Sequence, residues 1–281
     1  MAMETRSEHG CFGGTQGFYT HASSETGTAM NVAVYLPPQA QSGPVPALYY
    51  LAGLTCTDET FMVKAGAQRL AAEYGLALVS CDTSPRGLDL PGEHEDWDFG
   101  SGAGFYLDAT QAPWSDHYRM GGYVNAELPA LIEARFPVKP GLRGIMGHSM
   151  GGHGALVSAL RNPGLWHSVS ALAPISNPSA VPWGQKAFSH YLGSDESAWA
   201  EWDAAVLMAR AAHPAPILVD QGLADQFLER ELHPHTLEEA AKRSGQAITV
   251  RRHAGYDHGY YFIQSVIADH IAHHAASLVS G

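Results

Sequence analysis

A serine enclosed by glycines constrains this chain more than any other feature. It lies in the run Gly-Ile-Met-Gly-His-Ser-Met-Gly-Gly-His-Gly-Ala-Leu, residues 144–156. The mostly apolar segment 142–146 predicts a buried strand, and residues 153–161 predict a helix that ends before Pro163. Glycines on both sides of Ser149 permit a turn too tight for larger side chains. The sequence therefore predicts a sharp strand-to-helix turn that presents the Ser149 hydroxyl.

Residues 147–151 match the pattern G-x-S-x-G, which carries the nucleophile in α/β-hydrolases. The pattern alone is weak evidence in a chain with 30 glycines among 281 residues. A glycine-rich turn at a helix start is the competing interpretation. The strand, turn and helix follow one another in the order that a nucleophile elbow requires, and this order favours a nucleophilic serine.

Strand-like and helix-like segments alternate along the chain. The expected strands are 11–20, 30–36, 47–52, 77–81, 142–146, 168–173, 217–220 and 247–251, and the expected helices are 61–73, 123–135, 153–161, 229–243 and 264–278. Several strands are continuous apolar runs, which are typical of a parallel sheet buried on both faces. We therefore expect one domain over residues 1–281, an α/β-hydrolase fold with a mostly parallel eight-stranded sheet flanked by helices.

Two long segments, 83–117 and 174–210, interrupt this alternation. Both are rich in aromatic residues, which argues against disorder. We expect both to help wall the site as excursions of the same domain. Trp97, Phe99 and Trp183 are candidate pocket-wall residues, and ordinary core packing is the competing interpretation for each.

A nucleophilic serine needs a base, and in this fold the triad residues occur in the order Ser, Asp, His. Among 16 histidines, position selects His258, in the loop between the last strand and the final helix. His253 is an alternative, but it lies too close to the strand end. We expect His270, His273 and His274 to face solvent on the final helix. Their spacing suggests a metal site, but no acidic partner is evident, so no metal is expected.

Asp225 is the expected triad acid, because it lies in the loop just past the strand 217–220. Asp220 is the alternative, although its place in the strand favours a structural role. Asp257, next to the expected base, is interpreted as a loop hydrogen-bonding residue.

An oxyanion hole requires two backbone N–H donors. Met150, which follows the nucleophile, supplies one. The loop that begins at residue 51 supplies the other, and there Gly53 permits close approach and Leu54 N–H is the expected donor. Each such donor typically contributes roughly 3 kcal/mol to lowering the barrier.

The composition restricts the classes of binding partner and the cellular location that we expect for this protein. A net charge of −12 argues against a general nucleic-acid-binding surface. The three cysteines, Cys11, Cys56 and Cys81, are too few and too widely spaced for a disulfide framework and suit a reducing compartment. Neither a signal peptide nor a membrane span is evident, so we expect a cytoplasmic protein with no membrane association.

The chain resembles the S-formylglutathione hydrolases, also called esterase D, over nearly its whole length. The resemblance is carried by residues 51–61 (Leu-Ala-Gly-Leu-Thr-Cys-Thr-Asp-Glu-Thr-Phe), 64–69, 82–87, 97–110, 117–120, 147–156 and 256–258 (Tyr-Asp-His). These motifs are far more specific than G-x-S-x-G. The resemblance implies an α/β-hydrolase fold, hydrolysis of S-formylglutathione to formate and glutathione in formaldehyde detoxification, and a cytoplasmic, often dimeric enzyme that needs no cofactor.

Carried over by position, Ser149 resembles the family nucleophile, Asp225 the acid and His258 the base. Leu54 and Met150 match the oxyanion positions. Cys56 matches a cysteine near the site whose modification can inhibit the enzyme. The departures are mild: Gly259 replaces a more usual Ser, and glycines 121–122 replace a Tyr-Ser.

Other interpretations stay open at this point. A general short-chain carboxylesterase would use the same triad, so only competition between substrates separates the two. A non-catalytic binding protein on the same fold is disfavoured by the intact Ser, Asp and His. Cys56 as the nucleophile lacks a base at a recognisable position, and a small, buried apolar role is its competing interpretation.

Overall fold

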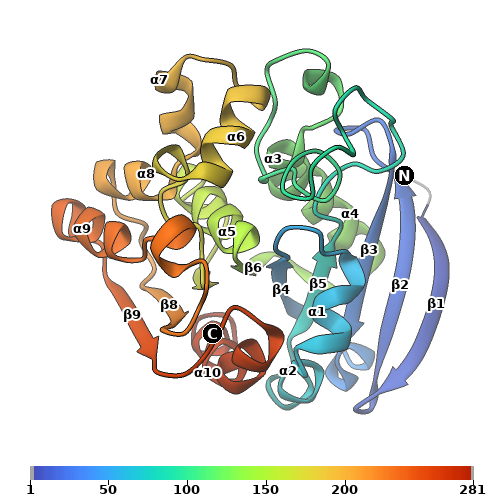
Figure 1. The fold of residues 1–281 in the computed structure, drawn as a ribbon. Coiled ribbons are helices and arrows are strands. Elements are labelled where there is room, and N and C mark those ends of the chain that lie inside the picture. The colour runs from blue at the N-terminus through green and yellow to red at the C-terminus, as the bar shows by residue number, and fades with distance from the viewer. Residues whose placement is uncertain (1–2, 280–281) are drawn as a thin grey trace.

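A nine-stranded sheet runs through the molecule in a computed structural model that describes residues 3–279 (Figure 1). The strands are β1 (Met3–Cys11), β2 (Gly14–Ala22), β3 (Ala29–Leu36), β4 (Val45–Leu51), β5 (Ala77–Cys81), β6 (Val138–His148), β7 (Ser168–Leu172), β8 (Ile217–Gly222) and β9 (Ile248–His253). Their order in the sheet is β1-β2-β3-β5-β4-β6-β7-β8-β9. The first three pairs, from β1 to β5, are antiparallel, and every later pair is parallel.

The prediction of a mostly parallel sheet is confirmed, but the expected number of eight strands was one too few. The additional strand is β1, whose sequence is Met-Glu-Thr-Arg-Ser-Glu-His-Gly-Cys. It is a largely exposed strand at the edge of the sheet, where it pairs with β2. Because neither of its faces is buried, it carries no apolar alternation by which a strand can be recognised.

The helices are α1 (Asp58–Lys64), α2 (Gln68–Tyr74), α3 (Met120–Gly122), α4 (Leu128–Arg135), α5 (Met150–Arg161), α6 (Pro182–Tyr191), α7 (Glu196–Trp199), α8 (Ala204–Arg210), α9 (His235–Ser244) and α10 (Tyr260–Leu278). Two expected helices are divided. The segment 61–73 breaks at Gly66, whose φ of +68° is left-handed. The segment 229–243 breaks at Pro234, which separates a π-helical turn, Leu228–Leu232, from α9.

The central strands are buried because helices cover both faces of the sheet (Figure 1). All residues of β4, β5, β7 and β8 are buried, which accounts for the apolar runs within them. Helix α5 packs across β4, β6 and β7, whereas α10 packs across β6, β7 and β8. The site described below therefore lies on a rigid, doubly covered framework.

The two excursions differ in their regular structure. Residues 83–117 have little regular structure apart from a 3₁₀ turn at Trp114–Asp116, whereas residues 174–210 contain α6, α7 and α8. They come together across the top of the view in Figure 1.

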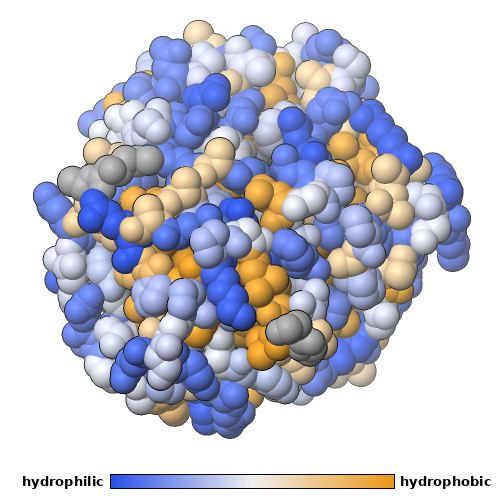
Figure 2. Space-filling view, turned by 180° about the vertical axis from the view of Figure 1, so that it is seen from behind, coloured by the Kyte–Doolittle hydropathy of each residue, from blue (hydrophilic) through white to orange (hydrophobic). Residues whose placement is uncertain are grey.

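The face seen in Figure 2 is dominated by hydrophilic side chains, with apolar ones in smaller patches between them. Within residues 3–279, no helix is both long and apolar enough to cross a membrane.

The expectation that the histidines of the final helix face solvent is wrong for His270 and His274, and His273 is only partly exposed, with its Nε2 3.0 Å from the Val169 carbonyl. His270 and His274 are fully buried, one turn apart on the side of α10 that faces the sheet. His274 Nδ1 and Nε2 lie 2.6 Å and 2.8 Å from the hydroxyls of Ser168 and Ser170 on β7. Their polarity suggested exposure, but serines on the facing strand satisfy their hydrogen bonds.

An acidic partner also exists, contrary to expectation. His270 Nδ1 lies 2.8 Å from Ser170 Oγ, and its Nε2 lies 3.1 Å from Asp220 Oδ2. Asp220 additionally accepts hydrogen bonds from Arg251 Nε at 2.6 Å and from His253 Nε2 at 3.1 Å. Within residues 3–279 no set of three or more His, Cys, Asp or Glu side chains is arranged to hold a metal ion.

Candidate active site

Ser149 lies at the junction between β6, which ends at His148, and α5, which begins at Met150. Its φ of 58° and ψ of −121° are strained for a residue with a side chain, as expected for a nucleophile elbow. A Cβ atom at Gly147 would collide with the Gly151 carbonyl, and one at Gly151 would collide with the Leu51 carbonyl. The glycines of the motif therefore allow β6, α5 and the end of β4 to meet around the serine.

Asp225 and His258 extend from neighbouring parallel strands, β8 and β9, in the loops that follow them. The two loops are joined by backbone: Ala224 N–H donates to the Tyr256 carbonyl at 2.8 Å. A Cβ atom at Gly222 would collide with that same carbonyl, so this close approach requires a glycine. The backbone thus fixes Asp225 and His258 relative to each other.

His258 Nδ1 lies 2.5 Å from Asp225 Oδ2. Asp225 also accepts from Gln221 Nε2 at 3.1 Å and, through Oδ1, from Phe227 N–H at 2.8 Å. Because an ionised carboxylate only accepts hydrogen bonds, the proton between them belongs to His258 Nδ1. The Nε2 atom of a neutral His258 is then unprotonated, as a general base requires.

Ser149 and His258 line the same small cavity, of about 140 Å³. The cavity is lined by Gly53, Leu54, Cys56, Trp97, His148, Ser149, Trp183, Phe227, His258 and Tyr260. The expected wall residues Trp97 and Trp183 are among them. Phe99 is not: it packs in the core against Trp114 and Tyr191, at ring-centroid distances of 4.9 Å and 4.8 Å. Its position close to Trp97 in the sequence did not reveal this, because the chain turns inward between them.

The loop after β4 brings Gly53 and Leu54 to the nucleophile. A Cβ atom at Gly53 would come within 3.1 Å of Ser149 Cβ. Within residues 3–279, Leu54 N–H has no hydrogen-bond acceptor. Met150, the first residue of α5, has an N–H at a position that a helix leaves without an internal partner. Both expected donors are therefore placed around Ser149 with unused hydrogen-bonding capacity.

Cys56 lies on the cavity wall, partly exposed, near Tyr260 and Lys64. Burial raises the pKa of its thiol, and this effect outweighs the opposing influence of Thr60 and Lys64. The thiol is thus mostly protonated at neutral pH, which weakens the alternative of a cysteine nucleophile.

A row of aromatic rings connects the surface to His258. Trp97 meets Trp183 edge-to-face at 5.6 Å, Trp183 lies 4.7 Å from Phe227, and Phe227 lies 5.1 Å from His258, all between ring centroids. Trp97 and Trp183 come from the two excursions. The excursions therefore form part of the wall of the cavity next to His258.

Sequence reasoning missed three residues of this cavity: His148, Phe227 and Tyr260. The ring of His148 lies 4.5 Å from that of His258, and neither of its nitrogens has a hydrogen-bond partner within residues 3–279. Burial lowers the pKa of His148 well below its ordinary value, so it is neutral at neutral pH. Each missed residue is within two positions of a predicted triad residue, and that proximity was the available signal.

The rejected triad candidates lie elsewhere. Asp220 and His253 pair with each other in the network beneath α10, and neither lines the cavity. Asp257 accepts a hydrogen bond from Gly259 N–H at 2.9 Å, as a loop residue.

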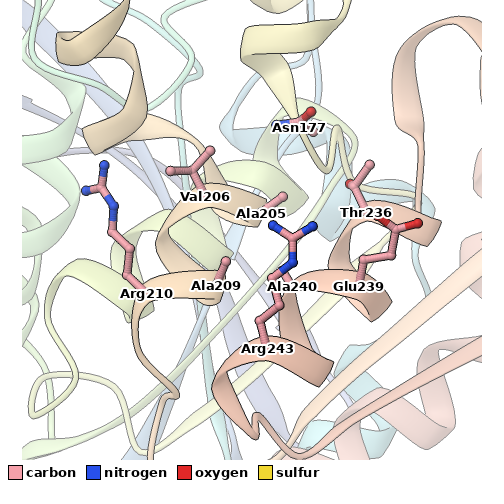
Figure 3. Close-up of a pocket in the computed structure, with 9 residues that line it drawn as sticks. All are labelled: Asn177, Ala205, Val206, Ala209, Arg210, Thr236, Glu239, Ala240 and Arg243. Carbon is pink, nitrogen blue, oxygen red and sulfur yellow. The ribbon is translucent and has the colours of Figure 1, made fainter.

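A larger cavity, of about 490 Å³, lies between α8 and α9 (Figure 3). Its lining includes Arg210, Glu239 and Arg243 and shares no residue with the cavity of Ser149. Size alone therefore does not identify the active site in this molecule.

Comparisons with known proteins identify the family of this chain. Residues 23–273 match the esterase family described as "Putative esterase". The chain is 52% identical to the S-formylglutathione hydrolase of Mus musculus, over 99% of both chains. It is also 52% identical to that of Paracoccus denitrificans, again over 99% of both. The solved S-formylglutathione hydrolase of Agrobacterium tumefaciens superposes with a TM-score of 0.95 at 47% identity, covering 98% of this chain and 99% of that one. The chain is therefore an enzyme that belongs to the esterase family and, within it, to the S-formylglutathione hydrolases.

Proposed function

We propose that this enzyme hydrolyses the thioester S-formylglutathione to formate and glutathione, with Ser149, His258 and Asp225 as its catalytic triad. The observation that carries the proposal is a nucleophile elbow whose serine shares a cavity of about 140 Å³ with a histidine held by a carboxylate. Full-length likeness to hydrolases of that name supports the substrate. A one-carbon acyl group suits so small a cavity.

In the acylation step, His258 Nε2 takes the Ser149 proton as Oγ attacks the thioester carbonyl carbon. Asp225 holds the ring in the required tautomer and stabilises the imidazolium that forms. The backbone N–H groups of Leu54 and Met150 donate to the developing oxyanion. The C–S bond then breaks, and glutathione leaves as a thiolate, to which the imidazolium can return the proton.

In the deacylation step, water replaces glutathione. His258 takes a proton from the water as its oxygen attacks the formyl carbon bonded to Ser149 Oγ. The tetrahedral intermediate uses the same two N–H donors. Collapse breaks the ester bond, returns the proton to Ser149 and releases formate, so no cofactor is needed in either step.

The decisive measurement compares kcat/KM for S-formylglutathione with that for p-nitrophenyl acetate, using Ser149→Ala as the control. A strong preference for the thioester, abolished in the variant, supports both the substrate and the nucleophile. Comparable or faster ester hydrolysis would leave the triad in place and identify a general short-chain esterase. Wild-type-like activity in the variant would refute the nucleophile.

The proposal extends to location and assembly. The three cysteines are free in the structure, which is compatible with the reducing conditions of a cytoplasmic enzyme. We further propose a homodimer, from family resemblance. Sedimentation of the purified protein at micromolar concentration tests this, and a single species of the 30.1 kDa monomer mass would contradict it.

A further inference from the structure

We propose that a cluster on the cavity rim, made of Asp96, Trp97, Asp98 and Lys186, binds the glutathione portion of the substrate. This inference rests on the proposed function. Here the cluster is called the rim cluster. It joins the two excursions, since its first three residues lie in 83–117 and Lys186 lies on α6.

The first argument is one of size. A cavity of about 140 Å³ is well below the roughly 300–1,000 Å³ of pockets that enclose a drug-sized ligand. The formyl group can enter, but the tripeptide must lie outside, against the rim. Of the aromatic residues that line the cavity, Trp97 is the most exposed, with 57% of its surface accessible. An indole in that position offers an apolar platform to a ligand.

The second argument is the geometry of Lys186. Its Nζ donates to Asp98 Oδ1 at 2.7 Å and to Asp96 Oδ2 at 3.1 Å, so the two carboxylates on either side of Trp97 are held to α6. Lys186 follows Trp183 by three residues, which places both side chains on the same face of the helix. The ion pairs therefore fix Trp97 against Trp183 at the opening of the cavity.

The third argument is the hydrogen-bonding capacity that remains free in the cluster. The glutathione portion carries two carboxylates and one ammonium group at neutral pH. An ammonium has three protons to donate, and Lys186 uses two of them within the cluster, which leaves one for a substrate carboxylate. Asp96 is exposed and uses only Oδ2 in this cluster, so Oδ1 is available to the substrate ammonium. The rim cluster thus offers an apolar face, a cation and an anion to a zwitterionic peptide.

The test compares S-formylglutathione with S-formyl-N-acetylcysteamine, a thioester with the same reacting group but without the peptide. In Trp97→Ala, we expect kcat/KM for S-formylglutathione to fall about tenfold, mainly through KM, and that for the truncated thioester to fall much less. In Lys186→Met and Asp96→Asn, we expect kcat/KM for S-formylglutathione to fall about threefold, because exposed ion pairs are individually weak. The value for the truncated thioester should again fall much less.

Matched controls separate binding from folding. Phe12→Ala removes an aromatic ring with the same exposed fraction, 57%, from the hairpin turn between β1 and β2. Lys139→Met removes an exposed lysine of β6. Both variants should retain the wild-type ratio of kcat/KM between the two thioesters. Lys186→Arg should recover most of the kcat/KM for S-formylglutathione that Lys186→Met loses.

The outcomes distinguish the two proposals. If the wild-type enzyme hydrolyses both thioesters equally and prefers p-nitrophenyl acetate, the proposed function fails. If the wild type prefers S-formylglutathione and the rim variants keep the whole preference, the function stands and the rim assignment is overturned.

Discussion

Gly53 lies directly against the nucleophile, because a Cβ atom at this position would come within 3.1 Å of Ser149 Cβ and 3.3 Å of the His148 carbonyl. Gly53→Ala should therefore displace the loop that carries Leu54 by a few tenths of an ångström. We expect kcat to fall about tenfold with a small change in stability, since the oxyanion donor is misplaced. Steady-state kinetics beside Gly164→Ala, where the added methyl meets nothing within 4 Å, checks this.

Asp225→Asn should reduce kcat roughly 10⁴-fold, because an amide can donate to His258 Nδ1 and so stabilise the wrong tautomer. The rate of labelling by a fluorophosphonate should fall in parallel. Asp257→Asn is the matched control, since Asp257 accepts from the Gly259 N–H in its own loop and, among residues 3–279, forms no side-chain hydrogen bond with Asp225 or His258. Comparable losses in both variants would remove Asp225 from its assigned role.

Asp220→Asn should affect the free energy of unfolding far more than it affects turnover. Burial alone would raise the pKa of Asp220, but hydrogen bonds from His270, Arg251 and His253 outweigh this and hold it well below its ordinary value. Loss of that charge should lower the free energy of unfolding by about 3 kcal/mol. Urea denaturation measures this effect. Turnover per folded molecule should stay within about tenfold of wild type; a loss as deep as that of Asp225→Asn would reinstate Asp220 as the triad acid.

Acid should destabilise the enzyme through its buried histidines. Burial lowers the pKa of His153 from 6.5 to about 4. Between these values the unfolded chain binds the proton and the folded chain does not. The free energy of unfolding should therefore decrease as pH falls from about 6.5 to about 4, by up to about 1.4 kcal/mol per pH unit for this residue.

Denaturation at pH 7 and pH 5 tests this prediction with His153→Leu, which should show a shallower pH dependence. His9→Gln, which alters an exposed histidine, should keep the wild-type slope. Equal slopes in all three proteins would refute the role of His153.

Alkylation of Cys56 should slow the enzyme, because the thiol lies on the wall of the cavity that holds Ser149. Since burial raises its pKa, reaction with iodoacetamide should accelerate as pH rises toward and above 9. Mass spectrometry establishes complete modification, and Cys56→Ala should resist inactivation. Full activity after complete alkylation would contradict the prediction.

The parts of this molecule that the sequence could predict are those that follow a local rule. The β6–Ser149–α5 turn was predictable because strand, glycines and helix are contiguous. The positions of Asp225 and His258 were predictable because each lies in the loop that follows a strand, β8 or β9. Two kinds of feature stayed hidden. β1 is an exposed edge strand without apolar alternation, and Phe99 and His270 are buried by segments about 90 and 100 residues away in the sequence.

The buried side of α10 holds an Asp–His–Ser series of its own, in which His270 contacts both Asp220 and Ser170. All three residues are fully enclosed. This series contains the same chemical groups as the triad, yet it is closed to substrate. Its serine lies within a regular strand and is not presented by a strained turn as Ser149 is. A fluorophosphonate should therefore modify one of the two serines and ignore the other. Reactivity in this enzyme is decided by access to the serine hydroxyl. A search for an Asp, a His and a Ser joined by hydrogen bonds would find both this buried series and the triad.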